Sequence, residues 1–330
     1  MGFRYFLGID VAKAKLDVVL LDSAEDRRRS KVVINTPEGF QVLVKWLAKQ
    51  GVGCADVHAI LEPTGVYHEK ALFALAQAGI AVSLVNPAQL RRFAQGLGIH
   101  TKTDACDSAV LARFGQLVKP VHWQPAPLKA RELRALLARR DAVAQDLQRE
   151  RNRAEQLVVD DTPDRVRRSL TEAISFLERE LQALQQAIDQ HIDDDPDLKR
   201  IWELLQSIPG VGQRVADHFT ALLSGRDFKS AEQLAAYLGL VPTEWQSGSS
   251  IKGRSRMSKA GSASLRQLLY MPAIVAVRRN PHIRALYERL LASGKAKMCA
   301  IGAAMHKLAH LCFGVVHTGQ PYRADWLVKA

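Results

Sequence analysis

The chain has 330 residues, of which 47% are hydrophobic and 24% charged, which excludes a mostly disordered chain or a collagen-like fibre. At roughly 150 residues per domain, this length predicts two or three domains. Its four cysteines lie far apart without a C-x-x-C pair, which argues against a disulfide framework and fits a reducing cytosol. No apolar run approaches the ~18 residues that span a bilayer, and the first residues lack the apolar core of a signal peptide. We therefore expect no membrane partner.

The formal net charge of +12 is concentrated in the last third of the chain. Residues 201–330 carry 17 basic and 7 acidic side chains, whereas residues 121–200 carry 14 and 16. Between Gln246 and Met298 there are eleven Lys or Arg residues and one acid, Glu288. Such a block indicates a surface that binds a polyanion, most often a nucleic acid. The alternative is a solvated basic face that keeps the protein soluble.

The first third of the chain alternates between patterns typical of strands and of helices. Short apolar runs predict strands at residues 3–9, 15–21, 31–34, 57–61 and 80–85, with a polar turn at 22–29. Helices are expected at residues 37–50, 67–78, from 87 onward, and at 103–117. A three-strand meander followed by strand–helix–strand units predicts an α/β domain with a mixed sheet and flanking helices.

The middle segment, residues 128–195, contains no glycine and predicts two long helices separated at residues 161–163. Apolar residues recur in the second helix at alternating spacings of four and three: Leu170, Ile174, Leu177, Leu181, Leu184 and Ile188. This seam is typical of a coiled coil or a helical hairpin. Three adjacent acids at 193–195 are interpreted as a solvated turn that ends the helix, rather than as a metal site.

The last third is predicted to be mainly helical, with helices at 198–206, 213–223, 262–277, 281–292 and 297–317. Residues 207–212 resemble a helix-hairpin-helix turn, in which the backbone at Gly210 and Gly212 can hold a DNA phosphate. The alternative is a turn that joins two packed helices. A non-helical stretch at 241–261 contains four basic residues suited to phosphate contacts. They are Lys252, Arg254, Arg256 and Lys259.

Four acids occupy positions where a metal site would be expected. Asp10 follows the first predicted strand and Glu62 the fourth, while Asp104 and Asp107 lie on one face of a helix that Thr103 can cap. Carboxylates gathered at strand ends require cations, and hard oxygen ligands select Mg²⁺ or Mn²⁺. Two such ions about 4 Å apart would clamp the attacking and leaving oxygens of a phosphodiester. Taken singly, each acid has a simpler explanation as a turn, cap or solvated residue.

The order of these acids resembles the RuvC-like branch of the RNase H fold. The fuller resemblance is to DEDD-type insertion-sequence transposases, also called bridge recombinases. It rests on GIDVAK at residues 8–13, EPTG at 62–65, KTDACD at 102–107, SIPGVG at 207–212, AYLGLVP at 236–242, SGSSIKG at 247–253 and MSKAG at 257–261. Pro63 stands where the family commonly has Ala, at a position with no expected metal ligand.

The resemblance implies three parts: a RuvC-like catalytic domain at residues 1–125, a coiled-coil segment at 126–197 and a basic C-terminal transposase domain at 198–330. It also implies a transposase of a mobile element, working in the bacterial cytosol and associated with the nucleoid. Donor and target DNA would be paired by a structured non-coding guide RNA. Dimers would assemble into a tetramer.

The resemblance further implies a serine nucleophile, which by its position in the motif is Ser247. Its attack would leave DNA attached through a 5′-phosphoserine, and a metal-bound carboxylate site would activate its weakly nucleophilic hydroxyl. Ser249 and Ser250 lie in the same loop and remain alternatives. Two other functions stay open at this point. One is a metal-dependent, junction-resolving or transposing nuclease that uses water, and the other is a nucleic-acid-binding protein with an inactive RNase H fold.

Overall fold

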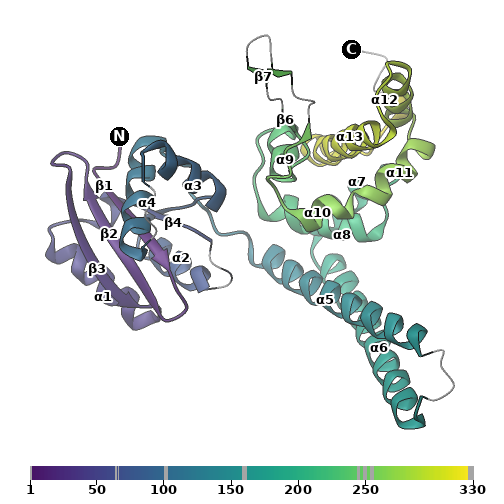
Figure 1. Ribbon diagram of the computed structural model, residues 1–330, viewed down its shortest axis with the longest axis horizontal. Coiled ribbons are helices and arrows are strands. Elements are labelled where there is room, and N and C mark those ends of the chain that lie inside the picture. The colour runs from purple at the N-terminus through teal and green to yellow at the C-terminus, as the bar shows by residue number, and fades with distance from the viewer. Residues whose placement is uncertain are drawn as a thin grey trace. The chain divides into compact units, whose positions relative to one another are not determined.

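The computed structural model describes residues 2–63, 65, 67–99, 103–157, 162–243, 246–247, 251–252 and 256–325. The chain divides into two compact units, Met1–Pro125 and Ala126–Ala330 (Figure 1). Each unit has its own hydrophobic core and is described by itself. The further division at residue 197 stays a prediction.

Unit 1 contains a five-stranded mixed sheet with the order β3-β2-β1-β4-β5. The strands are β1 (Tyr5–Val11), β2 (Lys15–Asp22), β3 (Arg27–Ile34), β4 (Val57–Leu61) and β5 (Ala81–Leu84). Strand β2 runs antiparallel to both β1 and β3, and β4 and β5 continue the sheet in parallel with β1. This arrangement confirms the predicted α/β, RNase H-like class.

Strand β3 begins four residues earlier than its apolar run predicts. Arg27 already pairs with Asp22 of β2, so the expected turn is shorter and the polar residues before Lys31 belong to the strand. The reason is that β3 lies at the edge of the sheet, where charged side chains can extend into solvent while the backbone still pairs with β2. Apolar alternation therefore underestimates the length of this strand.

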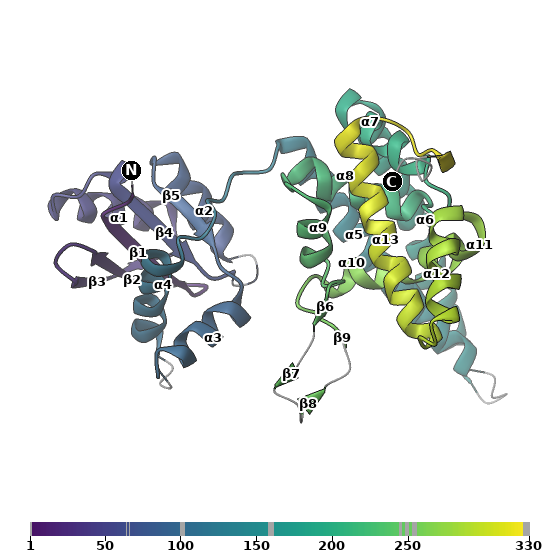
Figure 2. The ribbon, with the colours of Figure 1, turned by 90° about the horizontal axis from the view of Figure 1, so that it is seen from above.

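Helices cover both faces of the sheet, as Figure 2 shows. They are α1 (Pro37–Lys49), α2 (Tyr67–Gln77), α3 (Pro87–Gly96) and α4 (Asp104–Val118), with a 3₁₀ turn at Cys54–Asp56. Leu7 and Ile9 pack with α1 and α2, whereas Phe6 packs with α3 and α4. Because side chains alternate along a strand, Gly8 and Asp10 share the face that α4 covers.

Two glycines permit a close approach of α4 to the sheet. A Cβ added to Gly8 would lie 1.9 Å from the Ser108 carbonyl oxygen, and one added to Gly115 would lie 2.1 Å from Ile60 Cδ1. Any side chain at Gly8 would therefore push the helix away from β1. This contact sets the distance between the strand that carries Asp10 and the helix that carries Asp104.

In unit 2, α5 (Leu128–Gln156) and α6 (Asp164–Asp193) form a long hairpin (Figure 1). The two predicted helices are thus confirmed, and Leu133 and Leu137 of α5 are buried with Ile188 of α6. The remaining seam residues of α6 are only half-buried: Leu170, Ile174, Leu177, Leu181 and Leu184. One hairpin therefore leaves part of the apolar seam in contact with solvent.

The rest of unit 2 is a helical body with two small β-ladders. Its helices are α7 (Pro196–Gln206), α8 (Gln213–Gly225), α9 (Ala231–Tyr237), α10 (Ala263–Leu268), α11 (Tyr270–Arg279), α12 (Pro281–Ala292) and α13 (Lys297–Thr318). The ladders pair β6 (Pro242–Thr243) with β9 (Arg256–Met257) and β7 (Gln246–Ser247) with β8 (Ile251–Lys252). The single helix predicted at 262–277 is divided into α10 and α11, because Pro272 has no N–H to bond to the Leu268 carbonyl.

Among the described helices, α13 alone has the length and apolar composition of a membrane span, with a mean hydropathy of 1.5 over 18 of its residues. However, Ile301, Met305, Leu308 and Cys312 of α13 lie in the core of unit 2. Packing against the surrounding helices accounts for this apolar composition.

Candidate active site

The β1–β2 hairpin places Asp10 beside another acid, Asp17. The two residues are direct cross-strand partners, so their side chains lie on the same face of the sheet. Burial, followed by the negative charges of Asp104, Asp107 and Asp17, raises the pKa of Asp10 above its usual range. Asp10 is therefore partly buried and lies in the field of three other carboxylates.

Glu62 comes directly after β4, at the same end of the sheet. The last paired residues of β1 and β4 are Ile9 and Leu61, so the parallel register brings Glu62 beside Asp10. Glu62 also follows Ile60 by two residues, and Ile60 belongs to the cluster under α4. Sequence position thus correctly placed Glu62 at the strand end that carries Asp10.

The N-terminus of α4 brings the other two predicted acids to this face. Thr103 caps the helix, as predicted, by accepting a hydrogen bond from the Cys106 N–H at 3.2 Å. The buried Ser108 hydroxyl donates to the carbonyl oxygens of Asp17 and Asp104, at 2.8 Å each. These bonds fasten the first turn of α4, which contains Asp104 and Asp107, to strand β2.

A lysine lies among these acids. Lys15 Nζ is 2.8 Å from Asp104 Oδ2 and 2.9 Å from Asp17 Oδ2. The hydrogen bond from Lys15 holds the pKa of Asp104 below its usual range, and the same bond raises the pKa of Lys15. Neither Lys15 nor Asp17 was predicted from the sequence as a site residue. The tight turn between β1 and β2 is the signal that could have found them, because it pairs residue 10 with residue 17.

The donor chemistry of the cluster fits a hard divalent cation, since its ligands would be carboxylate oxygens. The Lys15 ammonium already lies between two of the carboxylates as a positive charge. Within the described parts of the chain, no three Asp, Glu, His or Cys side chains converge closely enough to hold a metal ion. Convergence would require Asp104 to exchange its contact with Lys15 for one nearer Asp10.

The predicted nucleophile, Ser247, lies on β7 and pairs with Ile251 of β8. The ladder also pairs Gln246 with Lys252, so these four described residues form a short antiparallel ladder. Ser249, Ser250 and Arg254 lie outside the described residues. The structure thus describes the backbone pairing of Ser247 and Lys252.

The base of this loop is anchored to the helical body. The Ser258 N–H donates to the Val241 carbonyl at 2.9 Å, and the Lys259 N–H donates to the Gly239 carbonyl at 3.2 Å. Both Arg256 and Lys259 are exposed. Two of the four basic residues predicted to contact phosphates are therefore accessible to solvent in the described part of the chain.

The turn between α7 and α8 contains Gly210 and Gly212, which could serve helix packing or hold a DNA phosphate. Gly210 has φ +105°, a backbone conformation that favours glycine. A Cβ there would also lie 2.6 Å from Ala276 Cβ of α11, so the packing between the turn and α11 requires glycine as well. Gly212 is exposed at the N-cap of α8, and a Cβ there would meet no atom within 4 Å. Gly212 thus leaves the N-terminus of α8 accessible to an anion.

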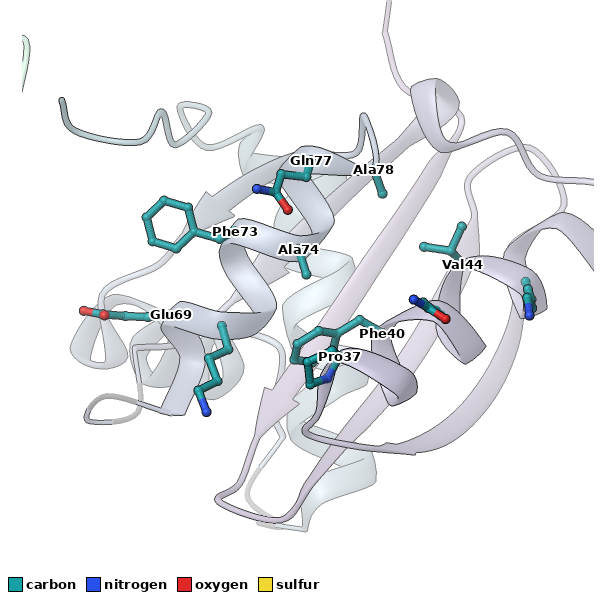
Figure 3. A pocket seen from close by; sticks show the side chains of 11 residues that line it. Pro37, Phe40, Val44, Glu69, Phe73, Ala74, Gln77 and Ala78 are labelled. Atoms are coloured by element: carbon teal, nitrogen blue, oxygen red, sulfur yellow. The ribbon is translucent and has the colours of Figure 1, made fainter. Parts of the chain in front are cut away.

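A surface hollow of about 760 Å³ lies between α1 and α2, lined by Phe40 and Phe73 among others (Figure 3). These helices cover the face of the sheet opposite Asp10. None of the predicted site residues lines the hollow. The hollow and the acidic cluster therefore lie on opposite faces of the sheet.

Comparisons with known proteins agree with the order of motifs. Residues 7–163 match a family described as transposase, and residues 202–288 match the transposase IS116/IS110/IS902 family. The pilin gene-inverting proteins of Moraxella bovis and Moraxella lacunata are 34% and 33% identical, each over 97% of this chain and 98% of its own length. An IS110 protein of Streptomyces coelicolor is 29% identical over 49% of this chain and 39% of its own.

A structure of T. thermophilus RuvC in complex with a Holliday junction substrate aligns with a TM-score of 0.27 and 13% identity, covering 36% of this chain and 99% of that one. Family membership rests on the sequence matches, which extend along almost the whole chain. The chain belongs to the IS110 family of transposases and recombinases, which are DNA strand-transfer enzymes.

Proposed function

We propose that this transposase cuts and rejoins DNA with a metal-assisted carboxylate site and a serine nucleophile, under the guidance of a structured non-coding RNA. The observation that carries the proposal is the placement of Asp10, Asp104 and Asp107 at one end of the sheet, on the face that α4 covers, with Glu62 beside Asp10 in the register. Close negative charges of this kind are costly without cations. A site that holds them near one another is therefore suited to bind a divalent cation.

The four acids would hold Mg²⁺, or Mn²⁺, through their carboxylate oxygens. The bound ion would supply positive charge to the phosphate undergoing attack. The raised pKa of Asp10, caused first by burial and then by the neighbouring carboxylates, supports this role, because a bound dication would offset both effects.

Ser247 would attack the phosphodiester through Oγ. A bond forms between Oγ and phosphorus, the bond from phosphorus to the 3′ oxygen breaks, and the hydroxyl proton ends on the released 3′ oxygen. A later attack by a 3′-hydroxyl restores both the serine and a DNA phosphodiester. Such an exchange keeps the number of phosphodiester bonds constant, as recombination requires, whereas attack by water does not. Since the acids and Ser247 belong to different compact units, the mechanism requires both units on the same DNA.

Partner binding is assigned to the basic unit 2. Exposed Arg256 and Lys259 would contact phosphates of DNA or guide RNA, together with Lys252 and Arg254, and the accessible α8 N-terminus at Gly212 would hold another phosphate. The half-buried seam on α6 supports self-association through the helical hairpin, giving a dimer and then a tetramer. This assembly would act in the bacterial cytosol at the nucleoid.

The test of the serine step uses labelled donor DNA, Mg²⁺ and the RNA encoded beside the gene. Active wild-type protein should yield a slow, protease-sensitive band on a denaturing gel, with protein joined to a 5′ end. Ser247→Ala should lose the band, whereas Ser249→Ala and Ser250→Ala should only weaken it. Retention of cleavage in Ser247→Ala would favour the water-using nuclease. A band that persists in Ser247→Ala but vanishes in Ser249→Ala or Ser250→Ala would move the nucleophile within the loop.

A further inference from the structure

Lys15 lies within the acidic cluster, although none of the roles predicted for the catalytic residues requires a lysine there. Its ammonium lies between Asp17 and Asp104, at 2.9 and 2.8 Å from their carboxylates. The lysine side chain is 45% exposed, whereas that of Asp17 is only 13% exposed. The pairing with Asp17 is therefore built into the sheet, while the pairing with Asp104 lies toward solvent.

The backbone fixes this arrangement. Lys15 and Asp17 are two residues apart on β2, so both side chains lie on the face that α4 covers. Ser108 joins the Asp17 and Asp104 carbonyls, which brings the first turn of α4 to the same strand. Gly8 permits the close approach of the helix. The backbone positions of β2 and α4 thus bring the side chains of Asp104 and Lys15 together.

We propose that Lys15 is the resident counter-ion of the acidic cluster, which holds Asp104 until a divalent cation takes that carboxylate. The proposal rests on the metal-assisted function above. Lysine and metal would compete for Asp104, and Asp17 would keep the displaced ammonium within the site. Asp17 is accordingly a positioning residue for Lys15.

Charge accounts for the exchange. In the absence of metal, Asp10 lies close to three other carboxylates, and Lys15 balances part of their charge. A dication brings two positive charges, so it can hold Asp104 and Asp10 together where one ammonium holds only Asp104 and Asp17. Loss of Lys15 should therefore have opposite effects on the two states. The metal-free protein becomes less stable and the affinity for metal rises.

The experiment measures binding of Mn²⁺ to the full-length protein without nucleic acid, by isothermal titration calorimetry. Lys15→Met removes the charge and keeps the length of the side chain. We expect its Mn²⁺ affinity to be about 2- to 5-fold higher than that of wild type, the range expected for losing a partly exposed ion pair. Lys13→Met, at an exposed lysine in the preceding turn, is the matched control and should change affinity less than 2-fold. In EDTA, Lys15→Met should melt at a lower temperature than Lys13→Met.

A background lacking the contested carboxylate tests the contact itself. In Asp104→Asn protein, adding Lys15→Met should leave Mn²⁺ affinity unchanged, because no carboxylate remains for the two cations to share. Unchanged or weaker Mn²⁺ binding in Lys15→Met, with a native circular dichroism spectrum, would overturn the proposal. So would an equal gain in Lys13→Met, which would reduce the effect to net charge. Mn²⁺ binding that is detected for Lys15→Met but not for wild type or Lys13→Met would support the proposal.

The proposed function fails by a different result. DNA cleavage by wild type in EDTA, at the rate seen with Mg²⁺, would remove the need for a metal. Wild-type protein that binds Mn²⁺ and cleaves DNA, without tighter binding in Lys15→Met, would leave the proposed function intact and reject the role of Lys15. If wild type and Lys15→Met both fail to bind Mn²⁺ at millimolar concentration, Lys15 does not hold a metal out of the site.

Discussion

The two regions proposed to act on DNA are built in different ways. Regular structure positions the acidic cluster of unit 1: a cross-strand pair, a parallel strand register, a capped helix and a close contact at a glycine. The segment of unit 2 that carries Ser247 has strands of only two residues each. Backbone hydrogen bonds anchor its base to the residues that follow α9. In the proposed mechanism, chemistry in the first region would depend on fixed distances between charges, whereas the second region would present a nucleophile to a large and variable substrate.

The charges of the two regions are also opposite. The cluster has an excess of carboxylates around Asp10, while the loop and the helices after it carry eleven basic residues and one acid between Gln246 and Met298. A basic loop attracts a phosphate backbone, and an acidic cluster repels it unless a cation intervenes. The difference in charge therefore predicts that unit 2 governs nucleic-acid affinity, and that loss of an acid in unit 1 impairs the chemical step without loss of binding.

Replacing Asp10 should produce the largest effect and would separate these roles most clearly. Asp10→Asn keeps the shape of the side chain but loses the charge that holds a dication. Cleavage of donor DNA should fall at least ~1000-fold. Binding of guide RNA, measured by gel shift, and the circular dichroism spectrum should remain as in wild type. A normal cleavage rate in Asp10→Asn would remove Asp10 from the site.

The next effect concerns assembly through unit 2. Leu177 and Leu184 are half-buried on α6, and changing both to Asp would place charges in the seam. Sedimentation velocity should then show a smaller species than wild type, with unit 1 still folded. As a control, Gln182→Asp combined with Gln186→Asp adds the same charge at exposed positions of α6 and should leave the oligomer intact. An unchanged oligomer in the leucine variant would restrict the seam to the hairpin within one chain.

The sequence predicted unit 1 well because its signals are periodic. Alternation and helix caps located every strand and helix there, and strand ends located Asp10 and Glu62. Asp17 and Lys15 could not be recognised by the same reasoning. Both fall inside a predicted strand, and their importance arises from a cross-strand register and from the position of α4. Contacts made between elements are invisible to a pattern read along one element.

Unit 2 shows the complementary limit. Its helices were predictable, apart from α9 and the division at Pro272, because long stretches with helical periodicity between turn residues are distinctive. The serine loop has no periodicity, so only its resemblance to a family motif singled out Ser247. Gly210 and Gly212 look equivalent in sequence, yet only Gly210 packs against Ala276. That distinction depends on α11, which lies far along the chain from both glycines.

A smaller effect should follow from closing the gap between β1 and α4. Gly8→Ala adds a Cβ that would lie 1.9 Å from the Ser108 carbonyl, so α4 must shift. Overpacking of this kind costs about 1–3 kcal/mol in the free energy of unfolding, measurable by urea denaturation. Cleavage should fall as well, since the helix carries Asp104 and Asp107. Gly96→Ala in α3 meets no atom within 4 Å and should not destabilise the protein. Equal stability of the two variants would mean that α4 is not held by Gly8.

The smallest effect is a pH dependence confined to unit 1. His58 on β4 is buried, shares a 2.7 Å hydrogen bond between its Nε2 and Ser83 Oγ, and lies 4.8 Å from the His122 ring. Burial first, and then the charge of His122, lowers the pKa of His58 to about 4. The folded state therefore favours neutral His58, whereas the unfolded chain takes up a proton near pH 6.5. The stability due to neutral His58 is fully present above about pH 6.5 and is lost as the pH falls toward 4.

Hydrogen exchange read by mass spectrometry can assign this loss to one unit. Between pH 7 and pH 5, after correction for the intrinsic exchange rate, peptides from β4 and β5 should lose protection in wild type. His58→Gln has no titrating ring, so its protection should change less over the same range, although burial of the amide lowers its overall stability. His317→Gln, at an exposed histidine of α13, should behave as wild type. If protection in β4 is as pH-dependent in His58→Gln as in wild type, another group in unit 1 causes the acid sensitivity.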